Sequence, residues 1–131
     1  MIYLVEDDSS IRELVIYALN STGLEAKGFE KPSEFWKAVE EEEPSLVILD
    51  VMLPEESGID VLKKIRSNPA IEKLPVIMET AKTSEYDRIN GLESGADDYI
   101  SKPFSMMEMV ARVKALIRRS EYKHEEKDYT I

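Results

Sequence analysis

The sequence predicts an α/β fold in which five parallel strands form one doubly wound sheet, a (βα)5 arrangement. The order of two kinds of segment leads to this prediction. Short apolar runs alternate along the chain with longer segments whose apolar residues recur at helical spacing. Such alternation is typical of parallel strands joined by right-handed crossovers, which put helices on both faces of the sheet. A chain of 131 residues is long enough for one core of this kind but not for two.

The first two strands differ in their pattern. Residues 2–5 are an apolar run that ends at three acids, whereas residues 24–29 alternate apolar or small residues with charged ones. The alternating pattern is typical of an exposed edge strand. The helix between the two strands is predicted to open with a capping box from Ser10 to Glu13 and to end at Gly23.

The middle of the chain contains the most apolar strand. Pro32 is predicted to open the second helix, whose apolar face carries Phe35, Trp36 and Val39. Residues 46–49 are an unbroken apolar run, which indicates a central strand buried on both faces. Gly58 then precedes a third helix with an apolar face of its own, formed by Val61, Leu62 and Ile65.

Two further strands complete the predicted sheet. Residues 76–78 form the fourth strand and residues 99–100 a short fifth strand. Between them, Ile89 and Leu92 mark a fourth helix that ends at Gly95.

The last helix is predicted to open with a second capping box, from Ser105 to Glu108. From residue 120 the chain becomes polar and charged. We therefore expect a folded domain at residues 1–119. Residues 120–131 are expected to be a linker rather than structure, leading toward a C-terminal domain that this chain lacks.

Composition excludes several classes of function. The net charge of −10 and the pI near 4.6 argue against binding of nucleic acid or a membrane surface by this chain itself. The absence of cysteine excludes disulfides and thiolate chemistry. No apolar run has the length of a membrane span, and no signal peptide precedes the first strand, so a cytoplasmic location is expected.

Side chains capable of chemistry follow the predicted strands. Ligands of doubly wound sheets gather at the carboxyl ends of the strands. The residues at those ends are Glu6, Asp7, Asp8, Asp50, Thr80 and Lys102. Acids that meet at one edge repel each other unless a cation joins them, and their oxygen ligands suit Mg²⁺. With the Thr80 hydroxyl and the Lys102 ammonium as donors to phosphoryl oxygens, Asp50 is a plausible nucleophile for phosphoryl transfer.

Five short motifs resemble the receiver domains of bacterial two-component response regulators, specifically those of the OmpR/PhoB group. They are Val5-Glu6-Asp7-Asp8, Leu49-Asp50-Val51-Met52-Leu53-Pro54 with Gly58, residues 75–78 with Thr80-Ala81, Gly95-Ala96-Asp97-Asp98-Tyr99, and Lys102-Pro103-Phe104. The resemblance covers residues 2–119 and implies the flavodoxin-like receiver fold. It also implies a signalling module rather than an enzyme. Such a module would control transcription through a DNA-binding domain outside this chain.

The resemblance implies a role for each acid. Asp50 would be the phosphoacceptor, which takes its phosphoryl group from a sensor histidine kinase. Mg²⁺ would be held by Asp7, by Asp50 and by the backbone carbonyl of Met52, with Glu6 reaching it through water. Asp8 is the third acid of its run and is not expected to be a direct ligand.

The resemblance also implies roles for the remaining site residues. Lys102 would pair with a phosphoryl oxygen, and the Lys102–Pro103 peptide bond should be cis. Thr80 and Tyr99 would form the switch pair, in which the hydroxyl moves to the phosphoryl group and the ring turns inward behind it.

A two-fold dimer is expected on phosphorylation, through the fourth helix, fifth strand and fifth helix. The expected intersubunit pairs are Arg88 with Glu108, Asp98 with Arg112, and Asp97 with Arg119, around an apolar patch of Ile89, Leu92 and Ala111. The alternative is an ordinary solvated face, because single exposed ion pairs contribute only about 0–1 kcal/mol.

One residue departs from the resemblance, and it leaves one rival function open. Glu79 stands where related receivers carry an apolar residue, so we expect it to reach solvent, a cation or a hydrogen-bond partner. The rival is a degenerate receiver that acts only as a protein-interaction module. A haloacid-dehalogenase-type phosphohydrolase is rejected because Met52 occupies the position of its second aspartate. A flavodoxin-like cofactor binder is rejected because no phosphate-binding loop follows the first strand.

Overall fold

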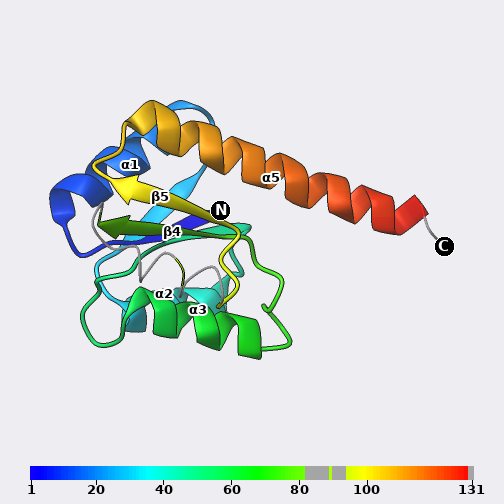
Figure 1. Cartoon of the computed structure of the whole chain (residues 1–131), viewed down its shortest axis with the longest axis horizontal. Helices are drawn as coiled ribbons and strands as arrows, with labels where there is room; N and C mark the ends of the chain where they lie inside the picture. The colour runs from blue at the N-terminus through cyan, green and yellow to red at the C-terminus, as the bar shows by residue number, and fades with distance from the viewer. Residues whose placement is uncertain (82–88, 90–93, 130–131) are drawn as a thin grey trace.

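The computed structural model describes residues 1–81, 89 and 94–129, and of residues 122–129 only the helical backbone (Figure 1). The strands are β1 (Ile2–Val5), β2 (Ala26–Phe29), β3 (Leu46–Asp50), β4 (Val76–Ala81) and β5 (Asp98–Lys102). They form one sheet in the order β2-β1-β3-β4-β5, and every neighbouring pair is parallel. The predicted five-stranded parallel sheet is confirmed, with β2 at an edge.

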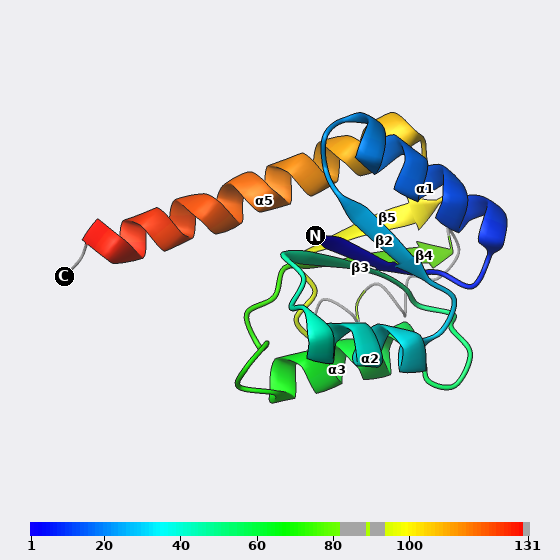
Figure 2. The ribbon, with the colours of Figure 1, turned by 180° about the vertical axis from the view of Figure 1, so that it is seen from behind.

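Helices cover both faces of the sheet, as expected for a doubly wound fold. They are α1 (Ser9–Ser21), α2 (Pro32–Glu41), α3 (Gly58–Ser67) and α5 (Met106–Tyr129). In Figures 1 and 2, α1 and α5 lie on one face and α2 and α3 on the other. Of the predicted fourth helix, Ile89 is described and is helical, while Leu92 lies outside the described residues. None of the helices in the described part of the chain is both long and apolar enough to cross a membrane.

The two core clusters show toward which face of the sheet each strand residue points. Leu4, Ile48, Ile77 and Ile100 belong to the cluster that packs against α1 and α5. Side chains alternate along a strand, so residues two positions further on face the same side. Those residues are Glu6, Asp50, Glu79 and Lys102. Four ionisable side chains on four adjacent strands therefore emerge on one face, at the carboxyl ends of the strands.

Two predicted boundaries near the site were wrong. Helix α1 begins at Ser9 and its N-cap is Asp8, whose carboxylate accepts from the backbone N–H groups of Ser10 (2.9 Å) and Ile11 (3.2 Å). An N-cap is defined by which carboxylate reaches the free N–H groups, and Asp8 lies nearer to them than the predicted Ser10. Strand β4 continues past its apolar run to Ala81, because β5 pairs with it along that length.

The C-terminal segment also differs from the expectation. Residues 120–129, expected to be a linker without structure, continue helix α5 to Tyr129 and extend beyond the sheet in both views (Figures 1 and 2). Glu, Lys and Arg are good helix formers, so a polar composition indicates exposure to solvent and not the absence of a helix. The division of the chain into a domain and a linker remains a prediction.

Candidate functional site

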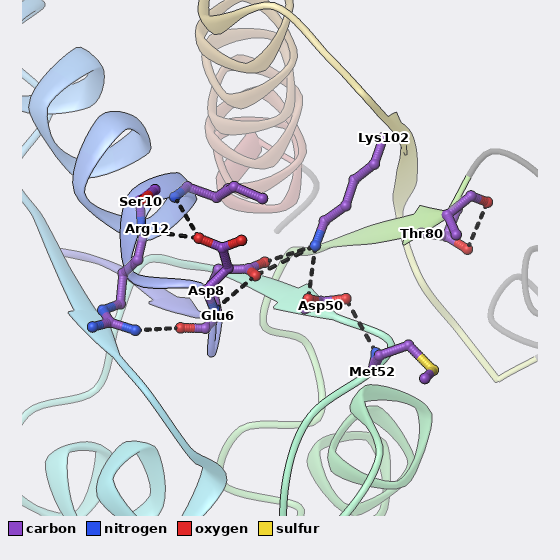
Figure 3. A network of polar contacts seen from close by, with 10 residues as sticks. Glu6, Asp8, Ser10, Arg12, Asp50, Met52, Thr80 and Lys102 are labelled. Carbon is purple, nitrogen blue, oxygen red and sulfur yellow. Dashed lines mark hydrogen bonds and ion pairs between the residues drawn. The ribbon is translucent and has the colours of Figure 1, made fainter.

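Lys102 joins two buried carboxylates at the carboxyl ends of three strands. Its Nζ lies 2.8 Å from Oδ2 of Asp50, and 3.1 Å and 3.3 Å from Oε2 and Oε1 of Glu6 (Figure 3). Glu6 follows β1, Asp50 ends β3 and Lys102 ends β5. Glu6 is fully buried, and Asp50 is 4% exposed. The structure therefore brings together three residues that the sequence analysis predicted to meet.

Backbone groups hold the two carboxylates in place. Oδ1 of Asp50 accepts from the backbone N–H of Met52 at 3.1 Å, and Oε1 of Glu6 accepts from the backbone N–H of Asp8 at 3.2 Å. The Arg12 guanidinium donates to the backbone carbonyl of Glu6 at 2.7 Å and fixes the turn after β1 (Figure 3). Sequence reasoning missed Arg12, because no pattern linked a side chain of the first helix to this turn.

The acids are arranged in a way that suits a divalent cation. Glu6, Asp7 and Asp50 can each offer a carboxylate oxygen, and these oxygens lie within 4.8 Å of one another. Asp7 is exposed at the mouth of a pocket that Met52 also lines. Three carboxylates facing one ammonium leave an excess of negative charge, and oxygen donors are the ligands that Mg²⁺ prefers. The carboxylate of Asp8 accepts the first N–H groups of α1, and its expected absence from the ligand set remains a prediction.

The pKa values of the charged groups in the site differ from those of the same groups on a protein surface. Burial raises the pKa of Asp50 to about 6; the neighbouring Glu6 adds to the rise, and the bond from Lys102 opposes it. Burial alone would lower the pKa of Lys102, but its hydrogen bond to Asp50 and the charges of Asp50 and Glu6 leave that pKa raised. Lys102 is therefore a permanent cation at neutral pH, and its positive charge supports the ionised form of Asp50.

Glu79 is the residue that departs from the pattern of related receivers, and of the environments expected for it the structure excludes solvent. It is fully buried, so it does not reach solvent. Neither carboxylate oxygen accepts a hydrogen bond from the described residues. Burial raises the pKa of Glu79 well above its usual range, and the neighbouring carboxyl of Glu6 makes the second largest contribution to the rise. When protonated, Glu79 can donate a hydrogen bond to Glu6, which is the partner that this position offers.

The proposed switch residues lie at the adjacent strands. Thr80 is buried near the end of β4, and its hydroxyl is 3.5 Å from the carbonyl of Ala81, which is at the outer limit for a hydrogen bond. Tyr99 on β5 is 8% exposed and packs in the cluster that faces α2 and α3. The Lys102–Pro103 peptide bond is cis, which confirms the prediction.

Gly58 packs so closely against the backbone of Asp50 that a larger residue would not fit there. A Cβ atom at Gly58 would collide with the backbone carbonyl oxygen of Asp50. The N–H of Gly58 also donates to the carbonyl of Val51 at 2.9 Å, which folds the loop after β3 back on itself. Gly58 belongs to one of the sequence motifs, but the physical reason for it becomes visible only in the folded chain.

Several of the residues expected to bridge two subunits are engaged within this chain. Arg112 contacts Asp98 at 3.0 and 3.2 Å, and its Nε lies 3.5 Å from Oε1 of Glu108. Asp97 accepts at Oδ2 from Arg66 (2.9 Å) and from the backbone N–H of Val76 (2.8 Å).

The other residues of the expected dimer face are placed as follows. Ile89, Ala111 and Arg119 are exposed. Arg88 and Leu92 lie outside the described residues. The intersubunit pairs therefore remain a prediction.

Comparison with known proteins agrees with this geometry. Residues 2–114 match the response regulator receiver domain family. The transcriptional regulatory protein GltR of Pseudomonas aeruginosa is 48% identical over 121 residues, which cover 92% of this chain and 50% of that protein. The phosphate regulon transcriptional regulatory protein PhoB of Escherichia coli is 44% identical over 118 residues, which cover 90% and 52%. The chain thus spans about half the length of these relatives.

Solved structures of receivers superimpose closely on the chain. A putative response regulator from Chloroflexus aurantiacus matches with a TM-score of 0.85 and 32% identity, covering 89% of this chain and 96% of that one. The receiver domain of the Francisella response regulator 1452 matches with a TM-score of 0.83 and 29% identity, covering 91% and 97%. The flavodoxin-like receiver fold is therefore confirmed. The chain belongs to the response regulator receiver domain family, and its relatives are regulators of the OmpR/PhoB type.

Proposed function

We propose that this chain is the phosphoacceptor receiver domain of a cytoplasmic two-component response regulator, with Asp50 as the acceptor. The observation that carries the proposal is the contact of the Lys102 ammonium with Asp50 and Glu6, beside the exposed carboxylate of Asp7. A carboxylate nucleophile, a fixed cation and a set of oxygen ligands at one strand edge are the parts that phosphoryl transfer requires.

In this proposal Asp50 attacks the phosphorus atom of a phosphohistidine on a sensor histidine kinase. The bond between phosphorus and the imidazole nitrogen breaks as the bond to a carboxylate oxygen of Asp50 forms, and an acyl phosphate results. Asp7, Asp50 and the carbonyl of Met52 would hold Mg²⁺, with Glu6 reaching it through water. The ion would supply positive charge beside the phosphoryl oxygens. Lys102, already 2.8 Å from Asp50, pairs with a phosphoryl oxygen of the product.

The conformational change that follows phosphorylation would pass from the site to β4 and β5. The hydroxyl of Thr80 would move to the phosphoryl group, and the ring of Tyr99, which is already buried in this structure, would pack inward behind it. This changes the surface that β5 and α5 form, where the predicted two-fold dimer assembles. The described residues of that face are Ile89, Asp97, Asp98, Glu108, Ala111, Arg112 and Arg119. The matched relatives are named as transcriptional regulators, and this supports control of transcription through a DNA-binding domain in the full-length protein.

Intact-mass spectrometry with acetyl phosphate tests this function. We expect the wild-type chain to gain one phosphoryl group in the presence of Mg²⁺ and none in the presence of EDTA. The Asp50→Asn variant should gain none under either condition. Equal labelling of the two proteins would contradict the assignment of Asp50.

A degenerate receiver that acts only as an interaction module is the second candidate. The observation that favours it is Glu79, a fully buried acid beside the phosphoacceptor strand. This alternative predicts that acetyl phosphate labels neither protein and that Asp50→Asn leaves all partner binding unchanged.

A further inference from the structure

The loop between β3 and α3 is fastened to helix α2 by two consecutive glutamates. Oε1 and Oε2 of Glu55 accept from the backbone N–H and the hydroxyl of Ser33, at 2.9 and 3.0 Å. Oε2 of Glu56 accepts from the indole N–H of Trp36 at 3.1 Å, and its Oε1 lies 2.9 Å from Nζ of Lys64. We call the contacts of Glu55 with Ser33 and of Glu56 with Trp36 the loop clamp.

Glu55 takes the place of a capping residue that α2 lacks. The N-cap of α2 is Lys31, whose side chain makes no cap hydrogen bond. The first N–H groups of a helix need external acceptors, and the positive end of the helix dipole favours an anion there. Glu55 supplies both from a loop 22 residues away along the chain. The contact therefore meets a real requirement of α2 and also binds the loop to that helix.

The backbone at Glu55 is in a conformation that its side chain does not favour. Its φ angle is +67°, in the left-handed region, where glycine is the usual residue. Such a residue persists only where the surrounding contacts hold it. The two contacts to Ser33 hold the side chain of Glu55, and a local turn closes around its backbone, because the N–H of Glu56 donates to the carbonyl of Pro54 at 2.7 Å. The loop is therefore kept in its shape by α2 together with this local turn.

The same loop carries Met52 at the mouth of the acidic pocket. Its start is fixed to the sheet, because the N–H of Val51 donates to the carbonyl of Glu79 at 3.0 Å, and the N–H of Met52 donates to Asp50. The far side of the loop is fixed to α2 by the clamp. The backbone of Met52 lies between these two attachments, so its position depends on both.

We infer that Glu55 and Glu56 are positioning residues that hold the backbone of Met52 in place for a divalent cation. This inference deepens the proposed function and rests on it, since it takes the Met52 carbonyl as a ligand. It also makes Trp36, the only tryptophan in the chain, a reporter of the loop, because its indole N–H bonds to Glu56. A cation that binds at Met52 should change the emission of Trp36 although Trp36 is not itself an expected ligand.

Glu55→Gly separates a positioning role from a structural one. Glycine adopts the left-handed conformation without strain, and this gain offsets the loss of the cap on α2, so stability should change little while the clamp loses its main contact. Loss of a residue that orients a metal ligand typically lowers metal affinity by about 10-fold or more. Glu55→Gln keeps one acceptor for the Ser33 N–H and should recover most of that affinity.

A matched control is available in the first turn of α2, the turn that Glu55 caps. Glu34 is exposed in the first turn of α2, and it bonds to the backbone N–H of Glu30 rather than to the loop. Glu34→Gln removes one negative charge from the same region of the molecule without changing the clamp. It measures the part of any change in affinity that comes from net charge alone.

Calorimetric titration of the full chain with MgCl₂ tests the inference, with Trp36 fluorescence and urea unfolding measured on the same proteins. We expect the Mg²⁺ Kd to rise about 10-fold in Glu55→Gly and to change little in Glu55→Gln and Glu34→Gln, with the unfolding free energy of Glu55→Gly close to that of wild type. The Trp36 signal should follow the calorimetric isotherm in the wild type.

The outcomes distinguish the two proposals. Wild-type affinity in Glu55→Gly, or a loss of affinity that appears only in variants with lowered stability, overturns the clamp and leaves the proposed function intact. A wild-type chain that does not bind Mg²⁺, or that binds it no better than Asp50→Asn, overturns both.

Discussion

Asp50 and Glu79 are paired residues of the sheet, side by side on β3 and β4, and both side chains are buried. Lys102 bonds to Asp50 but not to Glu79, whose oxygens accept no hydrogen bond from the described residues. Burial, the adjacent Glu6 and the charge of Asp50 raise the pKa of Glu79, while Lys102 lowers it. The position therefore carries an energetic cost that an apolar residue would avoid.

Glu79→Leu should stabilise the metal-free chain. The carboxyl group of Glu79 is buried and accepts no hydrogen bond from the described residues, so its removal is expected to raise the free energy of unfolding at neutral pH by about 1–3 kcal/mol. Because the folded-state pKa of Glu79 is raised, the cost exists above the unfolded-state pKa of 4.5 and should shrink as the pH falls toward that value. Urea unfolding measures it, with Glu79→Gln as the control that stays polar. A leucine variant no more stable than wild type would contradict this account.

Asp50→Asn should also stabilise the metal-free chain, with a pH dependence of its own. The pKa of Asp50 is about 6 in the folded chain and 3.8 ordinarily, so ionised Asp50 opposes folding above pH 6 by roughly 1–3 kcal/mol. The opposition fades between pH 6 and 3.8, and below that range both states are protonated. We therefore expect the gain in urea unfolding to be present at about pH 8 and absent at about pH 4. A gain that is the same at both values would show that ionisation of Asp50 is not its cause.

The sequence predicted most of the sheet and the main site residues because both follow simple rules. Apolar runs mark buried strands, and the carboxyl ends of parallel strands meet, so Glu6, Asp50 and Lys102 had to lie close together. The loop clamp was not predictable, because Glu55 and Ser33 meet only after α2 and α3 pack on the same face of the sheet. The length of α5 was underestimated for a different reason, since polarity was taken as evidence against a helix.

Thr80→Ala should separate phosphorylation from the response to it. Among the described residues the hydroxyl makes one 3.5 Å contact, so its loss should cost little stability and leave Asp50 able to accept a phosphoryl group. The amide chemical shifts around Tyr99 should then move less than in wild type when beryllofluoride and Mg²⁺ are added. Lys102→Ala, by contrast, should impair both phosphorylation and response. Full wild-type shifts in Thr80→Ala would refute its switch role.

Arg119→Glu should prevent the predicted dimer more cleanly than Arg112→Glu. Replacing Arg112 also breaks its bond to Asp98 within the chain, whereas Arg119 is exposed on α5. Within the described part of the chain the Asp97 carboxylate is bonded through Oδ2, which leaves Oδ1 available to Arg119 of a second copy.

Sedimentation velocity with beryllofluoride and Mg²⁺ measures this effect. Wild type and the control Arg118→Glu, a change at the adjacent exposed residue, should dimerise, and Arg119→Glu should stay monomeric. Dimers in all three proteins would rule out this pair.

The central claim is that the carboxylate of Asp50 carries the phosphoryl group, and chemical trapping tests it most directly. An acyl phosphate is reduced by borohydride to an alcohol, which converts the modified aspartate to homoserine. Peptide mass spectrometry after treatment with acetyl phosphate, Mg²⁺ and borohydride should find homoserine at position 50 and at no other aspartate. Homoserine at Asp7 or Asp8, or none anywhere in a chain that has gained a phosphoryl group, would contradict the account.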